Sequence, residues 1–208
     1  IVHAYEAWGD DFLLRLNGMF AIALWDDERQ RLLLARDRVG IKPLFYSECA
    51  GEVLFASELK ALFPHPAVSR RPEPVALYHY FSLKNIPAPF TAWQGCYQLP
   101  AGCRLIREAG QSQLQRWWHL PGEEDAGVSE AEWVEQLRNL LEDSVRLQMR
   151  SDVPMGAYRS GGVDSSSGVA LMSRMSPLPV KTFSLVYDAS VGHKTMDREC
   201  ARLMAERC

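Results

Sequence analysis

The feature that most constrains the fold is a strand–helix–strand pattern in the last third of the sequence. Val153–Tyr158 and Val180–Val186 have the length and apolar composition of buried strands, and Asp164–Met175 between them has helical spacing. Two strands joined through a helix lie parallel, and such crossovers are right-handed. The pattern therefore predicts an α/β fold with a parallel sheet.

The turn between that first strand and the helix reads Ser-Gly-Gly-Val-Asp-Ser-Ser, residues 160–166. Ligands of open α/β sheets bind at the carboxyl ends of the strands, which is where this turn lies. Gly161 and Gly162 let the backbone approach a ligand closely, and their N–H groups and those opening the helix form a nest for phosphate oxygens. The three serine hydroxyls can donate to the same phosphates. We therefore expect a phosphate site here.

Asp164 places a negative charge in this anion site. The arrangement makes physical sense if the carboxylate reaches a Mg²⁺ ion that neutralises the phosphates. The turn lacks the G-x-x-x-x-G-K-[ST] pattern and its lysine, so a Walker-type NTPase that transfers the γ-phosphate is not expected. The alternative is a serine–glycine turn in which Asp164 only caps the helix, but the complete motif at a strand-to-helix junction favours the phosphate site.

The N-terminal part is rich in antiparallel strand signals after an opening helix at residues 1–8. Met19–Asp26 and Arg31–Arg36 flank a polar turn and predict a hairpin, and the apolar runs Leu44–Ser47 and Val53–Ala56 predict that the antiparallel sheet continues. Residues 64–100 are proline-rich and indicate a connecting layer with one short helix, Val75–Leu83. A last hairpin is expected from Arg104–Ile106 and Gln113–Trp117.

The acidic segment Pro121–Gly127 is nearly free of apolar residues and is expected to link two domains, residues 1–120 and residues 128–208. After it, Glu130–Arg150 has apolar residues at three- and four-residue steps, with Ser129 in position to cap the first turn. This spacing predicts an amphipathic helix at the start of the second domain.

Composition and charge exclude several classes of function. The formal charge of −3 and a pI near 6.0 give no basic field, so neither nucleic acid nor an anionic membrane is expected as a partner. No apolar run approaches about 18 residues and no leader segment opens the sequence, so we expect a cytoplasmic protein. Five widely spaced cysteines argue against a disulfide framework or a zinc site. Both ends look cut, and we expect a fragment.

The Ser160–Ser166 motif resembles the pyrophosphatase loop of enzymes that cleave ATP between the α and β phosphates. The remaining sequence narrows the resemblance to glutamine-dependent (class B) asparagine synthetases over essentially the whole chain. The matching stretches are Leu16–Ala21 (LNGMFA), Ala35–Leu44 (ARDRVGIKPL), Ala56–Leu62 (ASELKAL), Ser151–Pro154 (SDVP) and Lys181–Ser184 (KTFS). The resemblance implies the later half of an N-terminal-nucleophile αββα glutaminase domain, followed by the start of a doubly wound ATP-pyrophosphatase domain of the adenine nucleotide alpha hydrolase type.

This resemblance also implies a reaction and a set of site residues. Glutamine supplies ammonia, and ATP with Mg²⁺ adenylates the β-carboxylate of aspartate for ammonia to attack. The implied ATP-binding residues are Arg159, Ser160, Gly161, Gly162, Val163, Asp164, Ser165, Ser166 and Leu185, with Asp164 also the Mg²⁺ ligand. The catalytic cysteine of the glutaminase falls before the stretch that matches Ile1. No catalytic residue is therefore expected in this chain, which by itself should lack glutaminase activity.

Several alternatives stay open at the level of the sequence. The family usually has leucine where Arg159 stands, so a non-catalytic scaffold that kept the fold is one alternative, and a related amidotransferase or β-lactam-synthetase-like enzyme acting on another carboxylate is a second. A homodimer is also left open. The charged cluster at 36–42 either shapes an ammonia path or forms a structural ion-pair network, which we favour. Trp117 and Trp118 are expected to be packing anchors rather than a stacking platform for bases.

Overall fold

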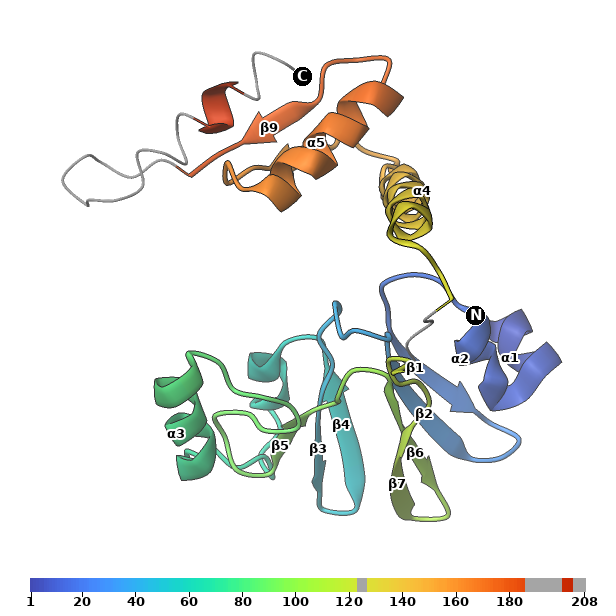
Figure 1. Cartoon of the computed structure of the whole chain (residues 1–208). Coiled ribbons are helices and arrows are strands. Elements are labelled where there is room, and N and C mark those ends of the chain that lie inside the picture. The colour runs from blue at the N-terminus through green and yellow to red at the C-terminus, as the bar shows by residue number, and fades with distance from the viewer. Residues whose placement is uncertain (123–126, 186–199, 204–208) are drawn as a thin grey trace. The chain divides into compact units, whose positions relative to one another are not determined.

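The computed structural model describes residues 1–122, 127–185 and 200–203. The chain divides into two compact units, Ile1–Gly122 and Glu123–Cys208, each with its own strands and helices (Figure 1). No helix in the described ranges is long and apolar enough to cross a membrane.

The first unit contains two antiparallel sheets. One has the strand order β1-β2-β6-β7 and the other has the order β4-β3-β5. The strands are β1 (Ala21–Asp26), β2 (Arg31–Arg36), β3 (Phe45–Cys49), β4 (Glu52–Ala56), β5 (Cys96–Gln98), β6 (Cys103–Glu108) and β7 (Gln111–Arg116). The helical elements are α1 (Val2–Trp8), η1 (Gly9–Asp11), α2 (Phe12–Arg15), η2 (Leu59–Leu62) and α3 (Pro74–Leu83).

The predicted hairpins are confirmed, but the prediction that the first four strands form one sheet is wrong. β1 pairs with β2, β3 pairs with β4, and β6 pairs with β7, all antiparallel. The segment between β2 and β3 carries the chain from one sheet to the other, and β6 then returns to pair with β2. The connecting layer also contains a strand that we did not predict. β5 is three residues long and pairs with β3, so its local pattern was too short to identify.

The two sheets pack against each other through alternate residues of their strands. Leu34 of β2 and Tyr46 of β3 share one buried cluster, whereas Leu33 of β2 packs in a second cluster with Phe12 and Leu13 of α2. Because successive strand residues face opposite sides, β2 separates a helical layer from the second sheet. The cluster between the sheets consists of Leu34, Leu44, Tyr46, Leu99, Cys103 and Leu105.

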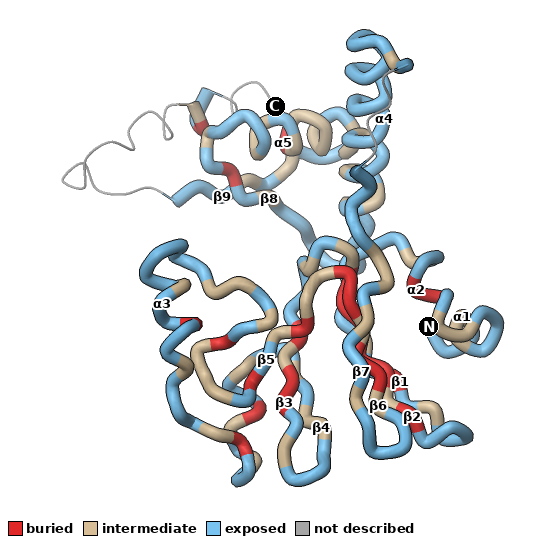
Figure 2. Tube along the Cα trace, turned by 60° about the horizontal axis from the view of Figure 1, so that its bottom comes forward, coloured by how far each residue is buried: buried red, intermediate tan, exposed pale blue. Residues whose placement is uncertain are grey.

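The outer face of the three-stranded sheet is covered by η2 and the chain that follows it. Phe45 and Leu54 pack there against the buried residues Leu62, Val68 and Cys96. The first unit therefore has the layer order helix, sheet, sheet, and helical turn, and its buried residues follow the two sheets (Figure 2).

Arg36 holds the segment that joins the two sheets. Its guanidinium is buried and donates three hydrogen bonds to backbone carbonyls, which are those of Lys42 (2.8 Å), Leu99 (2.8 Å) and Gly40 (2.6 Å). Burial lowers the pKa of this guanidinium, partly opposed by Asp37. A buried cation needs acceptors for its donors, so these bonds fix the path of the chain from 40 to 42 and at 99.

Asp37 is the acceptor counterpart of Arg36. Its side chain, 1% exposed, accepts from the backbone N–H groups of Phe20 (3.3 Å), Ile41 (2.9 Å) and Lys42 (2.9 Å). Burial by itself raises the pKa of this carboxyl, but the amide hydrogen bonds outweigh burial and leave the pKa below its ordinary value. The prediction of an ion-pair network at 36–42 is thus wrong, because the side chains of Arg36 and Asp37 form their hydrogen bonds with backbone groups.

The tryptophan at the end of β7 has the packing role that the sequence indicated. The ring of Trp117 is stacked on Phe20 with centroids 6.1 Å apart and packs against the cluster that contains Phe12 and Leu33. Its neighbour Gly102 has φ +62, and a Cβ there would lie 2.6 Å from the carbonyl oxygen of Trp118. Glycine is therefore required where the chain returns to the first sheet.

The second unit contains the predicted helix and the predicted strand–helix–strand unit. α4 (Glu130–Gln148) begins with a capping box between Ser129 and Glu132, followed by β8 (Gly156–Tyr158), α5 (Val163–Met175) and β9 (Lys181–Phe183). β8 and β9 are parallel, as predicted, but shorter than predicted. Val186 lies outside the described residues. Within 127–185 and 200–203 the buried residues are Arg159, Val169 and Ala201, so this unit has a small core (Figure 2).

Replacing Asp37 with asparagine should destabilise the first unit. The amide cannot accept all three backbone N–H bonds, and leaving buried donors unpaired should cost about 2–4 kcal/mol. Because the folded pKa of Asp37 is lowered, its stabilisation is present near neutral pH and is lost as pH falls below about 4. Urea unfolding followed by hydrogen exchange of β2 peptides measures both effects.

Asp27→Asn provides the matched control, because Asp27 is exposed and its side-chain partners, Trp25 and Gln30, lie within three residues of it in the same hairpin. We expect wild-type stability from that variant at neutral pH. Equal stability of Asp37→Asn and wild type at pH 7 would contradict the role given to Asp37.

Candidate nucleotide-phosphate site

The Ser160–Ser166 turn lies at the carboxyl edge of the parallel strands β8 and β9. Tyr158 pairs with Phe183 at the end of the ladder, and the N–H of Arg159 then donates to the carbonyl of Phe183 at 2.8 Å. The chain leaves the sheet at Ser160 and enters α5 at Val163. The structure therefore places the motif at the strand-to-helix junction where the sequence predicted it.

Serine hydroxyls hold the turn in shape from within. The hydroxyls of Ser160 and Ser165 lie 3.2 Å apart, and Ser165 Oγ accepts from the N–H of Ser160 at 3.3 Å. Ser165 Oγ also lies 3.2 Å from the carbonyl of Gly162. Two of the three serines that we expected to donate to phosphate are thus engaged with each other, and either hydroxyl would have to rotate to meet a ligand.

Gly161 permits the bend of the turn. Its φ is +84, a conformation that residues with a Cβ rarely adopt, and Gly162 follows as the N-cap of α5 in an extended conformation. The cap makes no side-chain hydrogen bond to the helix. The first N–H groups of α5 have no acceptor within the helix, so this helix end can accept an anion.

Asp164 lies in the first turn of α5 and is exposed. Within the described ranges no three His, Cys, Asp or Glu side chains gather in a way that could hold a metal ion. Mg²⁺ commonly binds with one or two carboxylates and completes its shell with water and phosphate oxygens. Asp164 therefore fits a metal ion that arrives with a phosphate ligand.

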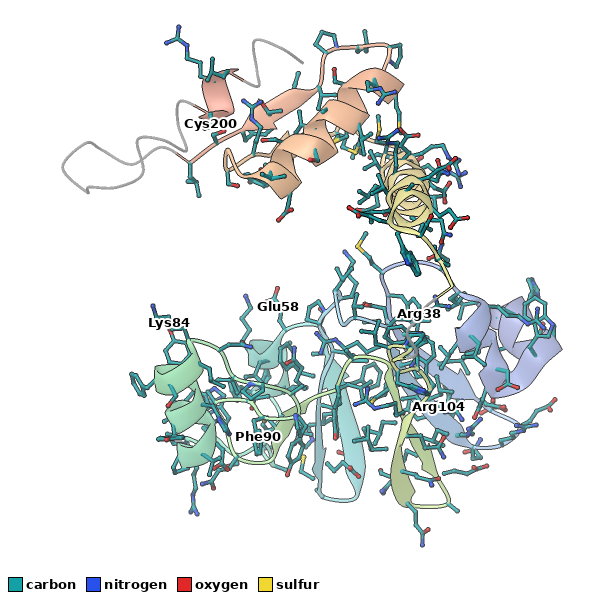
Figure 3. All side chains as sticks on the ribbon, in the orientation of Figure 1. Arg38, Glu58, Lys84, Phe90, Arg104 and Cys200 are labelled. Carbon is teal, nitrogen blue, oxygen red and sulfur yellow. The ribbon has the colours of Figure 1, made fainter. Side chains whose placement is uncertain are left out.

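A pocket of about 480 Å³ opens beside the turn. Gly161, Val163 and Ser166 line it from the motif, and Ser167 and Ala170 continue the lining along α5. The remaining lining residues, Cys200 and Leu203, come from the short helical segment 200–203, where Figure 3 labels Cys200. The pocket thus has one wall from the motif and its helix and another from a segment far along the sequence.

Several pocket residues were not predicted from the sequence. Ala170 lies seven residues after Val163, so the helical repeat places both residues on the same face of α5 and could have predicted that Ala170 lines the pocket. Cys200 and Leu203 gave no local signal, because only the tertiary structure brings their segment to α5. Conversely, Leu185 follows β9 at the same sheet edge as the turn but is 82% exposed and lies outside the pocket lining.

The side chain of Arg159 does not line the pocket. It is 4% exposed, and its Nη2 donates to the backbone carbonyl of Ala201. Its Nε and Nη1 are buried without a hydrogen-bond partner among the residues that the structure describes. The guanidinium of Arg159 is therefore buried, bonds to the segment 200–203 and is not part of the pocket lining.

Comparisons with known proteins match two successive parts of the chain to two families. Residues 1–118 match the family described as "Glutamine amidotransferase domain", and residues 136–208 match the family described as "Asparagine synthase". The chain belongs to the asparagine synthetase family. It is a mixed α/β chain that carries parts matching both domains of that family, in the order that the sequence predicted.

Individual relatives, which include asparagine synthetases and one amidase, match most of the chain. Asparagine synthetase [glutamine-hydrolyzing] 3 of Bacillus subtilis is 33% identical over 193 residues, which is 90% of this chain and 31% of the relative. A putative asparagine synthetase 2 of Methanocaldococcus jannaschii is 32% identical, covering 90% of the chain and 37% of the relative. Amidase chry2 of Gibberella zeae is 33% identical over 84% of the chain. The chain spans about a third of the length of the asparagine synthetases that it matches.

Gly161→Ala should weaken binding of inorganic pyrophosphate to the full-length protein by about tenfold, because a Cβ opposes the positive φ of the turn. Isothermal titration calorimetry with Mg²⁺ present measures the change.

Gly168→Ala is the matched control. Gly168 lies inside α5, a Cβ there meets nothing within 4 Å, and alanine favours the helix. Unchanged affinity in both variants would show that the turn does not hold the anion.

Proposed function

We propose that the protein carrying this chain is a glutamine-hydrolysing asparagine synthase, a carbon–nitrogen ligase. In the proposed reaction, ATP adenylates the β-carboxylate of aspartate, and ammonia released from glutamine displaces AMP to give asparagine. The observation that carries the proposal is the Ser160–Ser166 turn, which ends a parallel strand, bends at a glycine with positive φ and opens a helix beside a pocket.

The proposed work of this chain's residues is to bind and orient the nucleotide. The open N–H groups at the start of α5 would receive the pyrophosphate, and the helix N-terminus would stabilise its growing charge as it leaves. Ser160 and Ser166 are proposed as hydroxyl donors, and Leu185, at the same edge, as the contact to the adenine region. Such positioning holds the reacting groups together, and the stabilisation of charge on the departing pyrophosphate adds to the rate.

Asp164 is proposed to hold a Mg²⁺ ion together with the pyrophosphate oxygens. Its exposed carboxylate in the first turn of α5 would otherwise repel the anion that this helix end attracts. When bound, the metal ion would supply positive charge to the departing pyrophosphate.

The first unit is proposed as the later portion of a glutaminase domain, with residues 1–120 in that domain and 128–208 in the ATP-pyrophosphatase domain. Its layer order of helices, two antiparallel sheets and a helical turn supports the proposal of an N-terminal-nucleophile αββα fold. The parallel β8 and β9 with α5 between them support the doubly wound fold of the second domain.

A second candidate function is amidation of a carboxylate other than aspartate. The observation that favours it is the similarity to Amidase chry2, which is about as strong in identity as the similarity to the asparagine synthetases. In our proposal the described residues of the pocket bind the nucleotide, and they do not identify the carboxylate that is amidated.

An ATP–pyrophosphate exchange assay on the full-length protein, with Mg²⁺ and a panel of carboxylates, tests both functions. We expect exchange that depends on aspartate. Asp164→Asn should lower the exchange rate at least about tenfold, because it removes one charge-assisted contact to the metal ion. The defect should be partly relieved by raising the Mg²⁺ concentration.

Asp143→Asn is the matched control, since Asp143 is a surface residue of α4 that pairs with Arg146. Exchange with another carboxylate of the panel would support the second function. Exchange with none of them would overturn both and leave a non-catalytic scaffold.

A further inference from the structure

Arg159 is a buried cation among the few buried residues that the structure describes in the second unit. Three residues are buried within 127–185 and 200–203, and Arg159 is one of them, in company with Val169 and Ala201. Removing a guanidinium from water costs free energy unless its donors find acceptors. The acceptor that the structure supplies is the carbonyl of Ala201, which is itself 4% exposed and receives Nη2.

The backbone of Arg159 is fixed as well as its side chain. Its N–H extends the β8–β9 pairing by donating to the carbonyl of Phe183 at 2.8 Å. The next residue, Ser160, begins the Ser160–Ser166 turn, which we call the phosphate turn. One residue is therefore tied to the sheet through its backbone and to the segment 200–203 through its guanidinium.

The segment at the far end of this tie forms part of the pocket wall. Cys200 and Leu203, which flank the bonded Ala201, line the pocket together with Gly161 and Ser166 of the phosphate turn. The bond from Arg159 to Ala201 thus joins the segment that forms one wall to the residue that precedes the turn in the other wall. A leucine at this position would fill apolar volume but could donate no hydrogen bond to the carbonyl.

We propose that Arg159 is a positioning residue that fixes the 200–203 wall of the nucleotide pocket against the phosphate turn, and that its side chain does not contact the nucleotide. This assignment deepens the proposed function and rests on it for the identity of the ligand. The side chain acts through Ala201, so its loss should loosen the pocket and weaken ATP binding while the chemical step changes little.

The thiol of Cys200 reports the position of this wall without any nucleotide. Cys200 lines the pocket and is half-buried, so its alkylation by N-ethylmaleimide can be followed by mass spectrometry of its peptide in the full-length protein. We expect alkylation in Arg159→Leu to be at least about threefold faster than in wild type. Arg159→Lys should restore a rate near wild type, because its ammonium can still donate to the Ala201 carbonyl.

Steady-state kinetics of the same variants test the consequence for the nucleotide. Arg159→Leu should raise the KM for ATP about tenfold with kcat changed by less than about twofold, the pattern of a lost binding contribution. Arg174→Leu is the matched control, because Arg174 is an exposed residue in the last turn of α5, is not among the residues that line the pocket, and makes only a long ion pair with Glu142 (3.8 Å) among those the structure describes.

The outcomes separate this inference from the proposed function. Wild-type alkylation rates in Arg159→Leu would overturn the positioning role, as would a fall in kcat with an unchanged KM. Faster alkylation in Arg159→Leu, restored by lysine, in a protein with no ATP-dependent activity would support the role of Arg159 and count against the proposed function. If Arg159→Leu does not fold, Arg159→Lys decides the question. An alkylation rate and a KM for ATP near those of wild type would support the positioning role. An alkylation about threefold faster and a KM about tenfold higher in folded Arg159→Lys would overturn it.

Discussion

A buried guanidinium group needs hydrogen-bond acceptors, and in each unit of this chain a buried arginine finds one in the backbone of a distant segment. Arg36, at the end of β2, and Arg159, just after β8, each direct donors to backbone carbonyls of segments distant in the sequence. Burying a guanidinium without acceptors is costly. Arg36 bonds to three carbonyls, whereas Arg159 bonds to one and has Nε and Nη1 unpaired among the residues that the structure describes. In both units an arginine at or just after the end of a strand is thus bonded to the backbone of a later segment.

The first unit shows how such bonds organise packing. Arg36 and Asp37 fix the passage from one sheet to the other, and this passage lets alternate residues of β2 face α2 on one side and the second sheet on the other. The apolar clusters supply the driving force for burial, whereas the two charges select one path of the chain between the layers. Packing and polar bonding therefore depend on each other here.

In the second unit the candidate phosphate site lies where two short parallel strands meet one helix. The parallel pairing of β8 and β9 brings the phosphate turn and Leu185 to one sheet edge, and α5 begins at the turn. The pocket needs one more wall, which the segment 200–203 provides. Arg159, just before the turn, donates a hydrogen bond to the carbonyl of Ala201 in that segment.

The sequence by itself determined the local elements and the motif. The hairpins, the capped helix α4, the parallel strand pair and the position of the Ser160–Ser166 turn follow from periodicity, capping residues and turn glycines, which act over a few residues. The tertiary structure alone decided the division into two sheets, the strand β5, the bonds of Arg36 and Arg159, and the second pocket wall. Each of these joins segments far apart in the chain, and no short-range pattern records which distant partner a strand, a charge or a pocket will find.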